Sequence, residues 1–191
     1  EIEEIIIGSN SLSTQNYLDC RVMDLIIKAF YNNSIFDEAY SMVRVLKVSP
    51  FDCLIYMQKH SELYSKKIDQ IFKNFISETI EDLFDSRKKA TDYVLSSEKI
   101  NSYISGELGT NELTLHCALL LKEFDDICDL TFKSIKGVLC EKDLFTKKIE
   151  NYIVDLKKFT LMCKRDLFKT DKIKSAKFRY DFEVISKAKY S

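Results

Sequence analysis

Hydrophobic residues recur every three or four positions along most of this chain, which is the spacing of one face of an α-helix. The pattern is clearest over 64–84 and predicts a helix of about five turns. A first helix begins at Ser13 or Thr14, whose hydroxyls suit the cap position, and continues to Phe30 with apolar residues on most of its sides. With four glycines and one proline in the sequence, long helices are expected and a many-stranded sheet is not.

Small polar residues mark further helix starts. Ser34 is expected to cap a second helix over 36–46. Ser49 followed by Pro50 marks a third start, because proline fits the first turn of a helix. Residues 85–90 have little apolar content and predict a connection or a helix end, after which a weaker helix covers 93–104.

The longest periodic pattern covers 113–135, and its apolar positions all fall on one helical face. It predicts one helix that starts after Thr110 or Asn111 and ends at Gly137, a residue suited to a left-handed C-terminal position. A last helix is expected over 145–159.

Strand periodicity appears only near the two ends of the chain. Over 177–184 aromatic and aliphatic residues alternate with charged ones, and the opening 3–8 is rich in isoleucine. Because a strand must pair its backbone groups, the two segments pair with each other or join a sheet outside this chain. The predicted fold is therefore mainly α, a single bundle-like domain of six or seven helices over 1–191 with short strand-like segments at both ends.

Composition is that of a globular protein, with 46% hydrophobic and 31% charged residues. No apolar run approaches the roughly 20 residues of a membrane span, and no secretory signal is visible, so no membrane partner is expected. No two of the six cysteines are closer than eleven positions, and most lie on predicted apolar faces. Buried, reduced thiols are therefore expected, which indicates a cytoplasmic protein.

Charge is unevenly distributed, since residues 157–191 contain eleven Lys or Arg against four Asp or Glu. This basic tail is interpreted first as a solvated terminus and second as a docking surface. Its interleaved aromatic residues could stack on single-stranded nucleic acid, but the overall pI near 6.2 disfavours a nucleic-acid partner.

Motifs for self-contained chemistry are missing from the sequence. No glycine-rich phosphate loop and no GxSxG turn occurs, and His60 and His116 are the only histidines. His116 adjoins Cys117, whose side chain points about 100° away on a helix, so the histidine is expected at the edge of the core. His60 is expected at a helix end. The carboxylate pairs Asp125 with Asp126 and Glu81 with Asp82 are expected on solvated helix faces. No catalytic, cofactor-binding or metal-binding residue is therefore assigned.

The opening EIEEIIIGSNSLSTQNYLDCRVMDLIIKAFYN resembles the region after the catalytic barrel in radical S-adenosylmethionine proteins with an N-terminal cobalamin-binding domain. Glu3 to Ser13 follow the family's order of acidic strand, small residue and serine-rich turn, and Asn16 and Tyr17 stand where it often has an acidic residue and tryptophan. SPFDCL at 49–54 and FRYDF at 178–182 look like elements of its C-terminal parts.

This resemblance implies that the chain is the non-catalytic C-terminal accessory domain of a larger enzyme, packed on the missing N-terminal catalytic domains. The parent protein would hold a 4Fe-4S cluster and S-adenosylmethionine, together with the cobalamin that many members of the family bind. The CxxxCxxC and DxHxxG motifs that hold the cluster and the corrinoid do not occur here, so no cofactor residue is carried over. The apolar helix over 22–30 is expected to pack partly against the missing domain.

Two other functions are also consistent with the sequence. The chain could be a self-contained helical protein-interaction module that docks through its basic C-terminal tail. A stand-alone enzyme that uses Cys117 or His116 ranks last.

Overall fold

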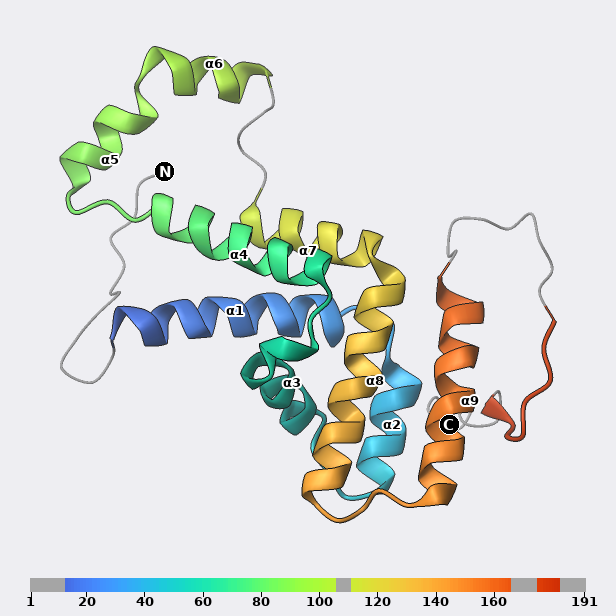
Figure 1. Cartoon of the computed structure of the whole chain (residues 1–191). Helices are drawn as coiled ribbons and strands as arrows, with labels where there is room; N and C mark the ends of the chain where they lie inside the picture. Colours follow the sequence, from blue (N-terminus) through green and yellow to red (C-terminus); the bar gives the residue numbers. More distant parts are fainter. Residues whose placement is uncertain (1–12, 106–110, 166–174, 183–191) are drawn as a thin grey trace.

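The computed structural model describes residues 13–105, 111–165 and 175–182, and most of these are helical (Figure 1). Nine α-helices occur in this part and no strand does, which confirms the mainly α fold class. The opening segment 3–8 lies outside the described residues. The elements in chain order are α1 (Thr14–Phe30), α2 (Asp37–Val45), α3 (Pro50–Lys59), the 3-10 helix η1 (Ser61–Leu63), α4 (Lys66–Glu81), α5 (Arg87–Val94), α6 (Ser97–Ser105), α7 (Glu112–Lys122), α8 (Phe124–Glu141) and α9 (Lys147–Lys164).

The helices form two groups that cross each other. In Figure 1, α1, α4 and α7 run side by side, while α2, α8 and α9 run steeply across them. Three rings join the groups, since Phe36 stacks on Phe30 at the end of α1 and on Phe124 at the start of α8, with centroids 6.3 and 6.4 Å apart. All three rings are buried, so the two groups share one core.

Helix α1 is the centre of the first group. It packs against α3, α4 and α7, which together cover its apolar face. Leu25, Ile26, Ala29 and Phe30 are fully buried there. The other apolar residues between 22 and 27 are half-buried, so the expected packing of part of this helix against a missing domain stays a prediction.

Helices α5 and α6 form an arm that stands apart from the body, beyond the ends of α4 and α7 (Figure 1). Ala90 is the one buried residue among the side chains that the structure describes in these two helices. Leu95 and Ile104 are largely exposed. The predicted connection or helix end over 85–90 is wrong in part, because a helix begins there: Ser86 caps α5 by accepting a hydrogen bond from the Lys89 amide.

Several predicted helix starts are confirmed. The Ser13 hydroxyl accepts from the Asn16 amide at the start of α1, and the Ser49 hydroxyl accepts from the Phe51 amide beside Pro50. Ser34 does not cap the second helix. Its φ of 57° is in the left-handed region, whereas an N-cap residue needs extended backbone, and α2 starts three residues later.

The pattern over 113–135 does not form one helix. The chain turns at Glu123, between α7 and α8, although Cys117, Leu120 and Phe124 remain on the buried side through the turn. Gly137 does not end a helix either. It lies inside α8, where an added Cβ would come 2.2 Å from the ring of Tyr56 on α3, so any larger residue there would require this ring to move.

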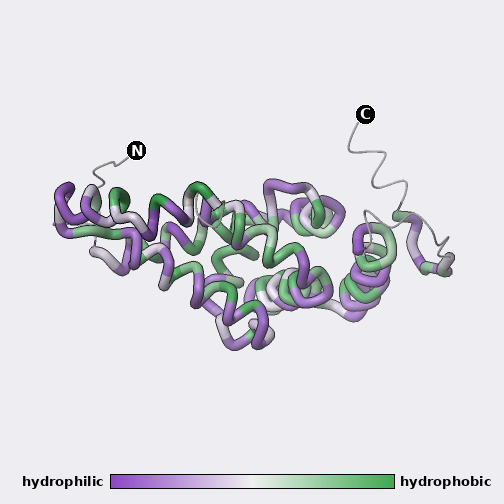
Figure 2. Tube along the Cα trace, turned by 90° about the horizontal axis from the view of Figure 1, so that it is seen from above, coloured by the Kyte–Doolittle hydropathy of each residue, from purple (hydrophilic) through white to green (hydrophobic). Residues whose placement is uncertain are grey.

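The predicted strand over 177–184 is also wrong as far as the structure describes it. Residues 175–182 form an irregular segment along the outer side of α9 (Figures 1 and 2). Buried and exposed residues nevertheless alternate along this segment as predicted, because Phe178, Tyr180 and Phe182 are the more buried residues and their neighbours are exposed. The aromatic side chains pack on α9 in place of a neighbouring strand.

Candidate functional site

An apolar groove of about 520 Å³ lies between α2, the start of α9 and the 175–182 segment, and we call it the α2–α9 groove. This volume falls within the range of about 300–1,000 Å³ that is usual for ligand pockets. The residues that line it are Ser41, Met42, Val45 and Leu46 from α2 and the residue after it, Thr146, Lys148, Ile149 and Tyr152 from α9 and its cap, and Tyr180.

Helix α2 builds one wall because its apolar stripe is wider than the core requires. Ala39, Tyr40 and Val43 point into the core and are buried. Met42 and Val45 continue the apolar surface around the helix and line the groove, where Val45 is 77% exposed. The helix therefore has one covered apolar face and one that is open.

A carboxylate on α9 fixes the opposite wall. Asp155 Oδ2 accepts hydrogen bonds from the Arg179 amide at 2.9 Å and from Arg179 Nε at 3.2 Å, and Oδ1 accepts from Nη2 at 3.0 Å. These bonds hold the pKa of Asp155 below its usual range, the backbone amide being the largest cause. They place the neighbouring Tyr180 ring 4.9 Å from that of Tyr152, edge to face. Burial, with a smaller contribution from Tyr180, raises the pKa of Tyr152.

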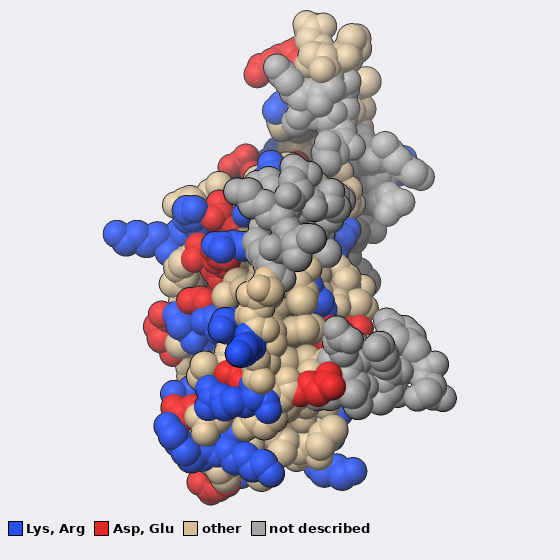
Figure 3. Space-filling view, turned by 90° about the vertical axis from the view of Figure 1, so that its right-hand side faces the viewer, with Lys and Arg blue, Asp and Glu red and all other residues tan. Residues whose placement is uncertain are grey.

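Lys148 is the one charged residue among the described residues that line the groove. It lies in the first turn of α9, which Thr146 caps by accepting from the Ile149 amide. The preceding residue, Lys147, forms an ion pair with Glu150 at 2.8 Å, whereas Lys148 has no ion-pair partner among the residues that the structure describes. Figure 3 looks onto the α9 side, where Lys and Arg predominate over Asp and Glu in the lower half.

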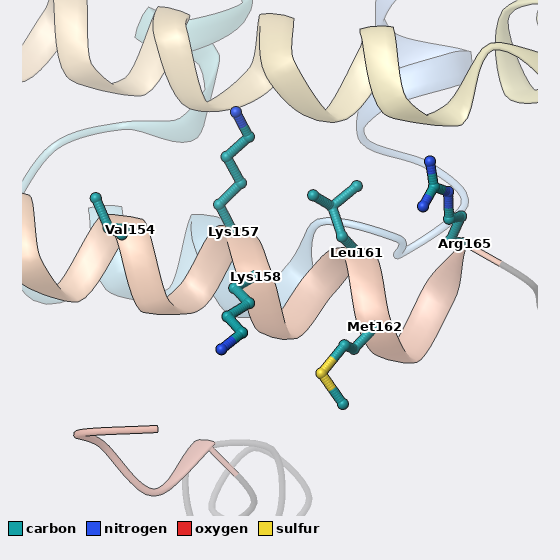
Figure 4. A pocket seen from close by; sticks show the side chains of 6 residues that line it. All are labelled: Val154, Lys157, Lys158, Leu161, Met162 and Arg165. Carbon is teal, nitrogen blue, oxygen red and sulfur yellow. The ribbon is translucent and has the colours of Figure 1, made fainter. Parts of the chain in front are cut away.

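A second hollow, of about 420 Å³, follows one side of α9. Its lining residues are Val154, Lys157, Lys158, Leu161, Met162 and Arg165. Figure 4 shows Lys157, Leu161 and Arg165 directed toward α8, and Lys158 and Met162 directed the other way. Lys157 pairs with Asp129 at 2.6 Å, Arg165 pairs with Asp125, and Lys158 lies over the Phe178 ring. Its cations are thus already engaged within the chain.

A polar hollow of about 390 Å³ lies where α7 meets α8. The carboxylates in it also have partners, since Glu123 pairs with Lys67 at 2.6 Å and Asp126 accepts from the Ser65 hydroxyl at 2.9 Å. Asp126 is therefore half-buried and not on a fully solvated face, while Asp125 is exposed. These contacts tie the start of α8 to α4 and α9.

His116 lies at the edge of the core, as predicted, and is 1% exposed. Its Nδ1 lies 3.1 Å from the Glu112 carbonyl, so this nitrogen carries the proton and donates. Nε2 then faces Glu78 Oε1 at 3.6 Å, and no hydrogen-bond partner for it occurs in the described part of the chain. The ring packs edge-on against Phe75.

Beside His116, Glu112 at the start of α7 meets Asp82 at the end of α4. Burial raises the pKa of Glu112 to about 7, and the hydrogen bond to Asp82 adds to the effect. Arg21 approaches Glu112 to 3.7 Å from α1, while its guanidinium lies over the Phe75 ring. Asp82, predicted on a solvated face, is exposed but also joins this cluster.

The remaining candidates lie apart from the groove. His60 ends α3, as predicted, and its Nδ1 lies 2.6 Å from Glu62 while its ring stacks on Tyr56. Burial raises the pKa of Cys117, and raises the pKa of Cys53 and Cys128 to about 12, so these thiols are protonated at neutral pH. The other three cysteines are exposed, so the expectation of mostly buried thiols holds for half of them.

The groove itself was not predicted from the sequence. The available signal was the run Met42, Val43, Val45 and Leu46, which covers more of the helix circumference than one core face needs. Much of the basic tail lies outside the described residues, so its docking role stays a prediction. Within the described ranges, no three His, Cys, Asp or Glu side chains are grouped to hold a metal ion.

None of the described helices is both long and apolar enough to cross a membrane. Comparison of the chain with protein-family models, with curated proteins and with solved structures finds no match.

Proposed function

We propose that this chain is a non-catalytic helical domain that binds another protein through the α2–α9 groove. The observation that carries the proposal is the 77% exposure of Val45 in a groove lined largely by apolar side chains. Single exposed apolar residues are common on protein surfaces, but a concave set of them is typical of a docking site.

The distribution of ionisable groups supports a binding role over a catalytic one. Besides the hydroxyls of Tyr152 and Tyr180, the groove contains one cation, Lys148, and no carboxylate or imidazole from the described residues. The cluster around His116 and Glu112 lies between α1, α4 and α7, away from the groove. General acid and base catalysis needs such groups within hydrogen-bond reach of the bound molecule.

The accessory domain of a cobalamin-type radical S-adenosylmethionine enzyme is a second candidate, favoured by the likeness of residues 1–32 and 49–54 to that family. In that case the groove would receive the catalytic part of the same polypeptide, in a cytoplasmic enzyme. The iron–sulfur cluster, S-adenosylmethionine and any cobalamin would belong to the preceding domains. A CxxxCxxC motif in the reading frame upstream of Glu1 would support this candidate, and its absence there would remove it.

The docking role is tested with two matched substitutions in the full-length protein from its natural source. Val45→Asp places a carboxylate in the groove, whereas Val154→Asp places one at a 56% exposed site on α9. Both positions are solvent-exposed, so stability should change by less than about 0.5 kcal/mol. Light scattering after size exclusion should show a smaller assembly for Val45→Asp only. An assembly of unchanged mass in the Val45→Asp protein would overturn the proposal.

A further inference from the structure

The shape of the α2–α9 groove distinguishes between kinds of occupant. Pockets for small molecules bury about 70–90% of the ligand surface. Here the wall residue Val45 is 77% exposed and lies beside half-buried Met42 and Leu46, so one side of the groove is open to solvent along α2. A small apolar molecule would remain partly in water, whereas a longer element lying along the groove would cover the whole wall.

The spacing of the apolar residues fits a helix as that element. Val45 and Leu46, at the end of α2 and just after it, follow Met42 by three and four positions, and Ile149 and Tyr152 are separated by three on α9. Such rows form the ridges between which the side chains of a third helix insert. An amphipathic helix laid between two others would present residues at the same spacing.

Charge indicates the chemistry of the occupant. Lys148 lies at the α9 end of the groove, where no carboxylate of the described chain neutralises it, although Lys147 beside it is paired with Glu150. The first turn of α9 adds the positive end of the helix dipole at the same place. An acidic side chain on the occupant would meet both, whereas a basic one would be repelled.

We infer that the groove binds an amphipathic helix of a partner protein that carries an acidic residue over Lys148. This inference rests on the proposed docking function and specifies its partner. The apolar face of the helix contacts Met42, Val45 and Ile149, and its acidic residue lies over the first turn of α9. Tyr180, held by the Asp155–Arg179 contact, closes the far wall.

The test is a selection from a random display library of peptides of about 16 residues, enough for four helical turns. The full chain is the bait, and the enriched peptides are then titrated against variants. We expect an apolar spacing of three and four together with Asp or Glu near one end. Lys148→Ala should weaken binding about two- to fivefold and Lys148→Glu about tenfold or more, whereas Lys147→Ala should leave it unchanged. Val45→Asp should abolish it.

Different failures separate the inference from the function on which it rests. Peptides that need Val45 but bind Lys148→Glu equally well would overturn the acidic partner and leave groove docking in place. Peptides that bind Val45→Asp as well as the natural chain, or no enrichment at all, would overturn both. A dimer of the chain that Val45→Asp dissociates would also overturn the inference, because a second copy would then occupy the groove.

Discussion

Asp155 on α9 and Arg179 in the 175–182 segment are joined by three hydrogen bonds, one of them from the Arg179 backbone amide. The contact gives an irregular segment a fixed place on a helix. The amide would have donated to a neighbouring strand in a sheet, and here a carboxylate accepts from it instead. Tyr180, which forms part of the groove wall, depends on this contact for its position.

Asp155→Asn should therefore release the 175–182 segment. An amide has the same shape but loses the charge-assisted bonds, so hydrogen exchange at Arg179 should accelerate by about tenfold or more. Mass spectrometry of the peptide that covers 175–182 measures this. Asp129→Asn is the matched control, since it removes the 2.6 Å ion pair with Lys157 and should leave the segment protected. If the 175–182 segment were equally protected from hydrogen exchange in Asp155→Asn and Asp129→Asn, the Asp155–Arg179 contact would not be what holds it in place.

The same contact predicts a response to acid. The pKa of Asp155 is lowered in the folded protein, so its stabilising effect is present above the unfolded value of 3.8. It should be lost as the pH falls through the lower folded pKa. Exchange at Arg179, corrected for the intrinsic rate, should therefore be constant between pH 5 and about 7. A marked loss of protection within that interval would show that another group controls the segment.

Glu112 predicts a pH dependence of opposite sign. Its pKa of about 7 lies above the ordinary value of 4.5 for a glutamate, so the folded state binds this proton more tightly than the unfolded state. Its contribution to stability is complete below pH 4.5 and is lost as the pH rises through about 7. Because the carboxyl is partly exposed, we expect a loss of about 1 kcal/mol. Urea unfolding at several pH values measures it, with Glu112→Gln as the control that removes the dependence. If the free energy of unfolding fell with pH equally in the natural protein and in Glu112→Gln, Glu112 would be excluded as the cause of the pH dependence.

Gly137→Ala should destabilise the protein although alanine favours helices by about 1 kcal/mol. The new Cβ would lie 2.2 Å from the Tyr56 ring and displace it from its stack on His60. The net cost should be about 1–2 kcal/mol. In a Tyr56→Ala background the obstruction is gone, so the same substitution should become stabilising. Thermal unfolding of the four proteins decides this, and an effect of the same sign in both backgrounds would refute the packing role of Gly137.

Phe36 predicts a larger loss because it joins the two helix groups through Phe30 and Phe124. Phe36→Ala should cost about 3–5 kcal/mol of unfolding free energy. Phe51→Ala removes a ring that is 48% exposed and should cost about 1 kcal/mol or less. Urea denaturation compares the two variants. Similar losses of unfolding free energy would show that the ring contacts of Phe36 do not hold the two helix groups together.

Sequence periodicity predicted burial better than it predicted chain direction. The residues expected on one face over 113–135 do lie in or against the core, yet the chain turns at Glu123 between two helices. The spacing of apolar residues indicates which side of the backbone is buried. A short turn that keeps the apolar residues on the buried side does not interrupt that spacing, so the turn cannot be predicted from it. For the same reason the alternation around Tyr180 predicted the correct buried side and the wrong element.

The groove depends on tertiary contacts that no local pattern contains. Val45 is as apolar as its buried neighbour Val43, and only the packing of α2 in the folded chain decides that Val43 lies in the core while Val45 lies in the open groove. Likewise, the sequence does not reveal that Glu112 meets Asp82, because the α5–α6 arm separates them along the chain.

Docking in the α2–α9 groove is tested most directly by a photo-crosslinking amino acid at Val45 in the full-length protein in living cells, with the same group at Val154 as control. We expect a protein adduct from position 45 and none from position 154. Mass spectrometry of the adduct then identifies the protein or protein segment that occupies the groove. No adduct from position 45, or equal adducts from both positions, would contradict the claim that the α2–α9 groove is the docking site.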